Sequence, residues 1–316
     1  MKMLSIIIPT FRKARILGNV LRSLCFQEGV NQELEIIVVD DGSPDDTEEV
    51  VESAARASSN RIRYLKQANR GVSAARNLGI QAARGDLVLF LGDDIVCTPR
   101  LVAGHLLWHK RFSDSRTVVS GPVTWPPDLP IDDFMSWLDN SPYQFAYYKL
   151  KGKTEISFRY FYTCNVSLRT QSVLENPFDE DIRYGFEDTE LGLRLRDQQY
   201  RLYFNESALG YHYHIRKFKA FRHRQKMVGV SLYYAHRNNP KMRISCKTPE
   251  ISLTRHARAV LRGAFFPLLK ALNQRRMIHK YWQVRLDLAL LRGYRAAERV
   301  DRRSHHGILR REELRP

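Results

Sequence analysis

Cysteine is scarce in this sequence. Only four cysteines occur among 316 residues, Cys25, Cys97, Cys164 and Cys246, and no two of them form a Cys-x-x-Cys pair. This spacing gives no support to a cysteine zinc site or a disulfide framework, and it favours a reducing compartment. The chain must therefore be organised by something other than sulfur ligands or bridges.

Long apolar runs are also absent. No stretch approaches the length of a membrane span, and the apolar run at residues 3–9 is too short for the centre of a secretory leader. We therefore expect a cytoplasmic protein, either free or peripheral at the inner face of the membrane.

Acidic residues are few in the last third of the chain. Residues 1–211 carry 25 Lys and Arg against 28 Asp and Glu, whereas residues 212–316 carry 26 against 6, so their net charges are −3 and +20. Such a basic segment suggests an anionic partner, for which membrane headgroups, nucleic acid and a phosphorylated substrate all qualify. A solvated basic surface is the alternative.

Two common phosphate-binding signatures are missing. The first apolar run ends at Pro9 without a following Gly-x-Gly-x-x-Gly, and no P-loop occurs anywhere in the chain. A dinucleotide-binding Rossmann half is therefore poorly supported.

What the sequence does contain is a regular alternation of strand and helix patterns. Apolar runs predict strands at residues 4–9, 35–40, 62–66 and 87–91. Helical patterns predict helices at residues 15–26 and 45–57, and a third helix that starts within residues 69–79 and runs to about residue 83. This order implies right-handed crossovers and an α/β fold with a mixed, mostly parallel sheet and flanking helices. Further along, helices are expected at 99–112 and 188–197, strands at 117–121, 161–168 and 202–204, and a long loop with short helices at 125–160.

The run from Leu87 to Leu91 is the centre of this pattern because it stops at two adjacent carboxylates, Asp93 and Asp94. Ligands collect at the carboxyl ends of parallel strands, and paired carboxylates there suit a divalent cation with its phosphates. A loop in which Asp simply follows a strand is the alternative.

Five motifs occur in order within residues 4–214. They are Ile6-Ile-Ile-Pro-Thr-Phe11, Val38-Val-Asp-Asp-Gly-Ser43, Asn69-Arg-Gly-x-Ser-x-Ala-Arg-Asn-x-Gly79, Gly85-Asp-x-x-x-Phe-Leu-x-Asp-Asp94 and Gly185-Phe-Glu-Asp-Thr-Glu-Leu-Gly-Leu-Arg194. The series resembles family 2 glycosyltransferases of the GT-A fold. That family transfers a sugar from a nucleotide diphosphate donor with inversion, usually with Mn2+ or Mg2+.

The resemblance implies a domain organisation. Residues 1–215 would form the GT-A catalytic domain, with a nucleotide-binding half at about 1–97 and an acceptor-binding half at about 98–215, and residues 216–316 would form a basic, mainly helical C-terminal region. It also implies a donor such as a UDP-sugar and a glycan, lipid-linked or other hydroxyl acceptor, as in polysaccharide and cell-envelope synthesis.

The resemblance further implies roles for the acidic residues. Asp94 matches the metal ligand, Asp93 the contact to the ribose or donor sugar, and Asp41 the carboxylate that holds the nucleotide. Asp188 matches the catalytic base and Glu187 an acceptor-orienting group. Two structural alternatives remain: Asp41 would close an Asx turn, and Asp188 would cap a helix.

Other positions match the family less closely. Pro9 and Phe11 would line the base, Arg76 would contact the nucleotide or form an ion pair, and Asn165 would lie near the donor sugar or satisfy a turn. His212 and His214 share one face of an extended segment and would contact the metal or the diphosphate, or pack as ordinary aromatics. Arg216 and Lys217 would add phosphate contacts.

The C-terminal region contains an amphipathic pattern. Apolar residues recur at helical spacing from Ala257 to Leu272 between arginines, and Pro267 predicts a kink or a break. Such a helix would lie on an anionic membrane, near a lipid-linked acceptor, or pack on the catalytic domain or on a second protomer in a homodimer. Residues 300–316 are expected to be a flexible end.

Together these observations predict a metal-dependent inverting glycosyltransferase. The alternative is a nucleic-acid-binding or anionic-surface-binding protein that uses the basic region on an inactive GT-A domain. Nucleic acid is not the expected partner, because the sequence contains no motif that reads RNA or DNA.

Overall fold

The computed structural model describes residues 3–250 and 252–305, which divide into two compact units. The first comprises residues 3–131, 138–183 and 187–215, and the second comprises residues 132–137, 184–186, 216–250 and 252–305. Each unit is described by itself below.

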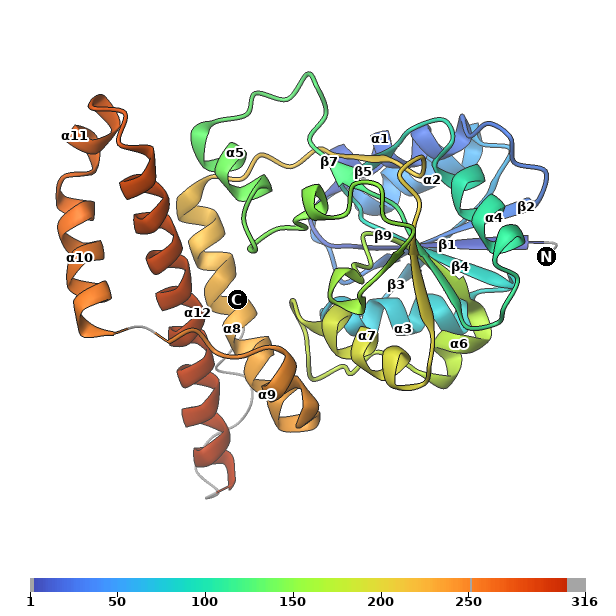
Figure 1. Cartoon of the computed structure of the whole chain (residues 1–316). Coiled ribbons are helices and arrows are strands. Elements are labelled where there is room, and N and C mark those ends of the chain that lie inside the picture. The colour runs from blue at the N-terminus through green and yellow to red at the C-terminus, as the bar shows by residue number, and fades with distance from the viewer. Residues whose placement is uncertain (1–2, 251, 306–316) are drawn as a thin grey trace. The chain divides into compact units, whose positions relative to one another are not determined.

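The first unit is built on an eight-stranded sheet in the order β3-β2-β1-β4-β9-β6-β10-β8. The half of the sheet formed by β3, β2, β1 and β4 is parallel, as the strand and helix alternation predicts, with β1 pairing with both β2 and β4. The blue to cyan part of Figure 1 shows this alternation. The elements are β1 (Met3–Thr10), α1 (Ala14–Cys25), β2 (Glu33–Asp40), α2 (Thr47–Ala57), β3 (Arg61–Lys66), α3 (Val72–Ala82) and β4 (Leu87–Leu91).

The other half of the sheet is mixed. β9 (Asn165–Arg169) lies between β4 and β6 (Thr117–Ser120) and runs antiparallel to both, which makes the sheet mixed rather than fully parallel. The remaining elements of this half are α4 (Leu101–Arg111), α6 (Thr170–Glu175), α7 (Glu187–Asp197), β10 (Arg201–Phe204) and the short β8 (Glu155–Ile156). The long loop contains two 3-10 turns, as expected from its irregular pattern, and α5 (Asp133–Asp139), of which residues 133–137 belong to the second unit.

Burial explains why the central strands are continuous apolar runs. All five residues of β4 are buried, and alternate residues along β1 and β4 enter different apolar clusters on the two faces of the sheet. α3 approaches the sheet closely through Gly79, where an added Cβ would lie 2.5 Å from Ile7 Cγ2. Each large apolar side chain buried in this way contributes about 1.5–3 kcal/mol.

A small second sheet continues directly from the acidic end of β4. It consists of β5 (Ile95–Cys97), β11 (Gly210–His212) and β7 (Val123–Thr124), with β11 antiparallel to β5. In that register His212 is paired with Ile95. The pairing brings the end of the first unit back beside Asp94, more than a hundred residues earlier in the chain.

The second unit is helical. Its elements are α8 (Phe218–Asn238), α9 (Lys241–Ser245), α10 (Leu253–Ala264), α11 (Phe266–Ala271) and α12 (Arg275–His305). Figure 1 shows α8 beside α12, and the two approach so closely at Gly229 and Gly293 that a Cβ at either position would collide with a backbone carbonyl of the other helix. Phe134 packs edge-to-face against Phe218, Phe221 and Trp282 in this unit, and the Phe218 and Trp282 rings are tilted toward each other.

The structure confirms one of two predictions for the C-terminal region and contradicts part of the other. The break near Pro267 is confirmed, because α10 ends at Ala264 and α11 begins at Phe266. The expected flexible end is wrong for residues 300–305, which continue α12 to His305, and residues 306–316 lie outside the described part. Among residues 3–250 and 252–305, no helix combines the length and the apolar character that a membrane crossing needs.

Candidate active site

The carboxyl ends of β1 and β4 meet at Asp93. Thr10 Oγ1 donates a hydrogen bond of 2.9 Å to Asp93 Oδ2, and the backbone N–H of Phe11 also donates to this carboxylate. Adjacent parallel strands bring their ends to one edge of the sheet, so the two segments converge although more than eighty residues separate them. Asp93 is thereby fixed against the loop that contains Phe11.

Asp94 lies at the centre of a cluster of ligand-type side chains. Its Oδ2 lies 2.8 Å from His214 Nδ1, and its Oδ1 lies 3.3 Å from His212 Nε2. The ligand atoms of these three residues all lie within 4.8 Å of one another. The histidines thus flank the carboxylate from both sides.

Backbone pairing and stacking hold the two histidines in place. The Tyr213 N–H donates to the Asp94 carbonyl at 2.9 Å, which extends the β5–β11 pairing by one bond. The Trp125 ring stacks on the His212 imidazole, with centroids 5.1 Å apart and planes 8° apart. Alternation along the extended segment then places His214 on the same side as His212.

Lys13 joins the same cluster. Its Nζ lies 3.2 Å from Asp94 Oδ2 and 3.0 Å from His214 Nδ1. Lys13 immediately precedes α1 and so stands at the carboxyl end of β1. A cation held by Asp94 and the histidines must therefore share the carboxylate with this ammonium or displace it.

The two aspartates have opposed electrostatics. Burial raises the pKa of Asp93 to about 7, and the neighbouring Asp94 charge adds to the rise. Burial also opposes ionisation of Asp94, but His212, His214 and Lys13 outweigh it and hold the pKa of Asp94 well below its usual range. Asp94 is thus the carboxylate that stays ionised, as a metal ligand must be.

The donor set fits a divalent cation. One ionised carboxylate and two imidazoles are ligand types used for first-row metals, and Mn2+ accepts both oxygen and imidazole nitrogen, whereas Mg2+ strongly prefers oxygen. The buried His212 Nδ1 has no hydrogen-bond partner among the described residues, so no second bond fixes which of its nitrogens faces Asp94. The residues present can hold Mn2+, and they can hold Mg2+ less well.

Asp188 occupies a separate part of the first unit, at the start of α7. The backbone N–H of Thr163 donates to Asp188 Oδ2 at 3.3 Å, and the Thr163 hydroxyl forms a short hydrogen bond to Oδ1. Burial raises the pKa of Asp188 to about 6, and the Glu187 charge contributes, while Arg76 and Thr163 oppose the rise. Because α7 begins at Glu187 and the Asp188 side chain binds Thr163, the helix-cap alternative does not describe it.

Arg76 pairs with the residue before Asp188. Its Nη1 lies 2.9 Å from Glu187 Oε1 and 3.8 Å from Asp188 Oδ1, and both members of the closer pair are buried. The Arg76 guanidinium also lies over the Phe178 ring at 5.3 Å. The ion-pair alternative therefore accounts for Arg76 in this structure, and the partner is the start of α7.

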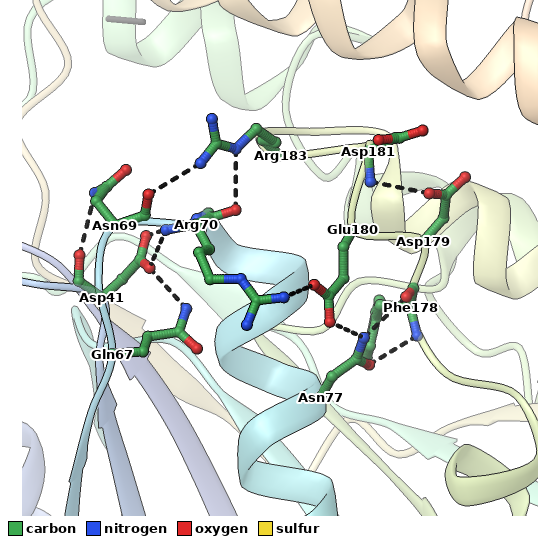
Figure 2. A network of polar contacts seen from close by, with 11 residues as sticks. Asp41, Gln67, Asn69, Arg70, Asn77, Phe178, Asp179, Glu180, Asp181 and Arg183 are labelled. Carbon is green, nitrogen blue, oxygen red and sulfur yellow. Dashed lines mark hydrogen bonds and ion pairs between the residues drawn. The ribbon is translucent and has the colours of Figure 1, made fainter. Parts of the chain in front are cut away.

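The Asp41 carboxylate anchors the segment that leads into α3. It accepts hydrogen bonds from Gln67 Nε2 at 2.7 Å and from the backbone N–H groups of Arg70 at 2.7 Å and Gly71 at 2.9 Å. Figure 2 shows this arrangement at the end of β2. A carboxylate has about four acceptor positions, so Asp41 retains one for a base or ribose. The side chain that closes the turn is that of Asp40, whose Oδ1 accepts a hydrogen bond from the backbone N–H of Ser43.

The same network reaches the loop before α7. Arg70 pairs with Glu180 at 2.5 Å, and Arg183 donates to the backbone carbonyls of Asn69 and Arg70 (Figure 2). Asn77 exchanges hydrogen bonds with the backbone of Phe178. The segment beside the candidate nucleotide residue is thus tied to the loop that leads toward Asp188.

Asn165 has a different place from the one expected. Its side chain is fully buried, donates to the carbonyls of Pro122 and Ala208, and bonds through Oδ1 to His105 Nε2 at 2.9 Å. No polar atom of this side chain faces solvent, because each is used inside the protein. The Asn165 side chain thus has no free polar atom for a donor sugar, and it joins α4, β9 and the segment before β11 instead.

The remaining expected residues are less constrained. Pro9 lies within β1 opposite Val39, and Phe11 is 36% exposed with the Arg12 guanidinium 4.9 Å from its ring centroid. Both lie at the carboxyl end of β1. Arg216 and Lys217 belong to the second unit, and their contact with phosphate stays a prediction.

Three residues that contact the site were not singled out from the sequence, namely Lys13, Thr10 and Thr163. Thr10 is the last residue of the first strand and Lys13 follows it closely, so the convergence of strand ends was a signal that could have found them. Thr163 lacked such a signal, because β9 inserts between β4 and β6 by a long-range antiparallel pairing that local patterns do not encode.

The fold and this site define a glycosyltransferase of the GT-A type. Residues 5–164 match the family model described as "Glycosyl transferase family 2", and the chain belongs to this family. Validoxylamine A glucosyltransferase of Streptomyces hygroscopicus subsp. jinggangensis (strain 5008) is 30% identical over 217 residues, which cover 61% of this chain and 51% of that protein. The chain thus spans about half the length of such curated relatives.

Solved structures support the fold. The mannosyltransferase PcManGT from Pyrobaculum calidifontis, in complex with GDP-Man and Mn2+, has a TM-score of 0.60 at 16% identity and covers 92% of this chain and 86% of its own. Residues 1–349 of S. aureus TarS, in complex with UDP-GlcNAc, have a TM-score of 0.53 at 17% identity and cover 96% and 92%. At these identities the likeness concerns architecture.

Proposed function

We propose that this glycosyltransferase moves a sugar from a nucleotide diphosphate donor, with a UDP-sugar favoured, to a hydroxyl acceptor with inversion at the anomeric carbon. The observation that carries the proposal is the cluster of Asp94, His212 and His214 at the end of the central strand. A diphosphate leaving group departs with negative charge, and a site that gathers cations there stabilises it.

In this proposal Asp94, His212 and His214 hold a divalent cation, Mn2+ in preference to Mg2+. When bound there, such a cation would supply Lewis-acid stabilisation of the departing diphosphate. Lys13, which lies 3.0–3.2 Å from two of these residues, provides a further positive charge for the same phosphates. Asp93, held by Thr10 and Phe11, offers its carboxylate to the ribose or the donor sugar.

Asp188 acts as the general base. The acceptor hydroxyl gives its proton to the Asp188 carboxylate while its oxygen bonds to the anomeric carbon, and the bond from that carbon to the diphosphate oxygen breaks. A single displacement of this kind inverts the configuration. A pKa of about 6 suits the role, because the carboxylate is ionised at neutral pH and is more basic than an ordinary aspartate.

The donor is held mainly by the loops at the ends of β1 and β2. Asp41 has one acceptor position left for an imide N–H or a hydroxyl, and Pro9 and Phe11 provide an apolar edge for the base. UDP-GlcNAc and GDP-Man, the donors in the two structurally similar proteins, support the donor class. The acceptor is proposed to be a glycan or a lipid-linked sugar of a polysaccharide or cell-envelope pathway.

The proposal is tested by donor turnover. Purified protein is incubated with UDP-, GDP-, dTDP- and CDP-sugars and Mn2+, and the release of nucleoside diphosphate is measured with water and with oligosaccharide acceptors. One donor class should be consumed by the wild type and not by Asp94→Ala, and Asp188→Asn should lose about 100- to 10,000-fold in rate. Equal turnover by the wild type and both variants would reject the proposed roles.

A further inference from the structure

The amphipathic segment of α10 and α11 has two apolar faces. One face packs within the second unit: Ala259 is fully buried, Leu269 is buried, and Gly263 lies against the ring of Tyr281 of α12. Phe266 also contacts the rings of Tyr281 and Trp282. Small residues and a few buried side chains therefore form the contacts of α10 and α11 with α12.

A second apolar face remains exposed. We name it the outer face and define it by five side chains that are 51–60% exposed: Val260, Leu261, Phe265, Leu268 and Leu272. At 100° per residue, Val260 and Leu261 point about 100° and 200° around the helix axis from the buried Ala259. Packing on α12 does not account for these side chains, and large exposed apolar patches mark interaction surfaces.

The segment that carries the outer face is strongly basic. Between Glu250 and Asp287 the sequence carries eight Lys and Arg residues and neither Asp nor Glu. Arg258 and Lys270 are exposed on the same helices, and Arg275 and Arg276 are exposed at the start of α12. A segment that exposes apolar side chains and carries only positive charges is complementary to one environment in particular, an anionic lipid surface.

We propose that the outer face docks this protein on anionic membrane surfaces, with its five apolar side chains inserted among the acyl chains and the neighbouring cations on lipid phosphates. A lipid-linked acceptor is confined to such a surface, so docking would raise its local concentration. The proposal rests on the second unit alone and stands whether or not the proposed donor chemistry is correct.

A second copy of the chain suits the outer face less well. Two copies in contact would bring together segments that each carry eight positive charges without an acid, and like charges across an interface are costly. Nucleic acid would pair with the cations but would leave the aliphatic side chains without an apolar partner. The anionic membrane satisfies both chemical components at once.

The test is sedimentation of the full chain with vesicles of phosphatidylcholine that contain either no phosphatidylglycerol or about 30% phosphatidylglycerol. The wild type should bind the anionic vesicles and bind the neutral vesicles far more weakly, and added salt should weaken the anionic binding. Failure of the wild type to bind anionic vesicles at low salt would overturn the proposal.

Two variants separate the apolar and electrostatic contributions. Leu261→Ser, Phe265→Ser and Leu268→Ser together should weaken anionic binding by at least about tenfold, because each removes exposed apolar groups that the docked protein would bury among the acyl chains. Arg258→Gln, Arg262→Gln and Lys270→Gln together should weaken it by about 100-fold at low salt, about fivefold for each charge. Circular dichroism melting of each variant confirms that α10 and α11 still fold.

A matched control uses exposed apolar residues of the first unit. Phe26 and Leu107 are 71% and 62% exposed, so Phe26→Ser with Leu107→Ser removes similar exposed surface elsewhere and should leave vesicle binding unchanged. An equal loss of vesicle binding in this control would contradict membrane docking. Sedimentation equilibrium gives a second test: membrane docking would also be contradicted if the wild type were a dimer and the outer-face variant dissociated it without any effect on vesicle binding.

Discussion

The Lys13 ammonium lies 3.2 Å from the Asp94 carboxylate, at the point where His212 and His214 also converge. A lysine among three candidate metal ligands competes with a cation for the same carboxylate. It also provides a permanent positive charge beside any phosphate bound there. The pair therefore links metal affinity to phosphate binding.

Lys13→Met should strengthen the binding of Mn2+ in the absence of nucleotide. The substitution removes a like charge near the cation, and because Lys13 is partly exposed the gain should be moderate, about three- to tenfold. Isothermal titration of Mn2+ into the protein measures it, and Lys13→Arg, which keeps the charge, serves as the control. Weaker Mn2+ binding by Lys13→Met would show that the lysine does not compete.

Metal preference follows from the two imidazoles. Mn2+ should bind at least about tenfold more tightly than Mg2+, because Mg2+ strongly prefers an all-oxygen octahedron. Replacing His212 and His214 together by Asn should reduce that difference, since oxygen replaces nitrogen in the donor set. Titration calorimetry with each ion gives the ratio of the Mn2+ affinity to the Mg2+ affinity. Equal affinities in the wild type would argue against the histidines as ligands.

The charges around Asp188 predict opposite shifts of the pH profile. The base works only when ionised, so turnover should fall as the pH decreases through about 6. Arg76→Met removes a cation that lowers the pKa of Asp188, so the midpoint of the pH dependence of turnover should rise by about one pH unit. Glu187→Gln removes an anion that raises it, so the midpoint should move down.

Both midpoints are read from the pH dependence of turnover with the active donor. Arg76→Met should also destabilise the protein by about 3–5 kcal/mol, because it leaves Glu187 buried without its partner. Arg76→Lys keeps the charge and should shift the profile least. Shifts of the same sign in Arg76→Met and Glu187→Gln would contradict the proposed electrostatics.

Asn165→Ala should affect stability rather than substrate binding. Its side chain bonds to His105 and to the carbonyls of Pro122 and Ala208, so truncation leaves buried polar groups unpaired and costs about 2–4 kcal/mol. Urea unfolding measures the loss. The donor affinity of the folded variant should be unchanged. A large loss of donor affinity at retained stability would instead indicate that Asn165 contacts the donor sugar.

The sequence predicted well those parts of the fold that repeat locally. The first three strand-helix units and the β4 strand follow from apolar runs and helical stripes, and the break before Pro267 follows from its missing N–H. The antiparallel insertion of β9 was not predictable in this way, because it depends on pairing between segments more than seventy residues apart.

The candidate site shows the same division. Asp93 and Asp94 could be placed at a strand end, since that end is defined by the residues beside it. The Arg76–Glu187 pair joins helices 111 residues apart, and the burial of Asn165 depends on α4 and on Ala208. Residue types alone do not distinguish a side chain that faces a ligand from one that satisfies buried backbone groups.

The most direct test of the central claim is the binding of nucleoside diphosphates at the Asp94 cluster. Thermal unfolding is measured with UDP, GDP, dTDP or CDP, each with Mn2+ or with EDTA, for the wild type, Asp94→Ala and the surface control Asp46→Ala. One nucleotide should raise the unfolding temperature by about 5 °C or more at saturation, only with Mn2+, in the wild type and Asp46→Ala but not in Asp94→Ala. An equal shift in Asp94→Ala, or no shift with any nucleotide, would contradict the claim.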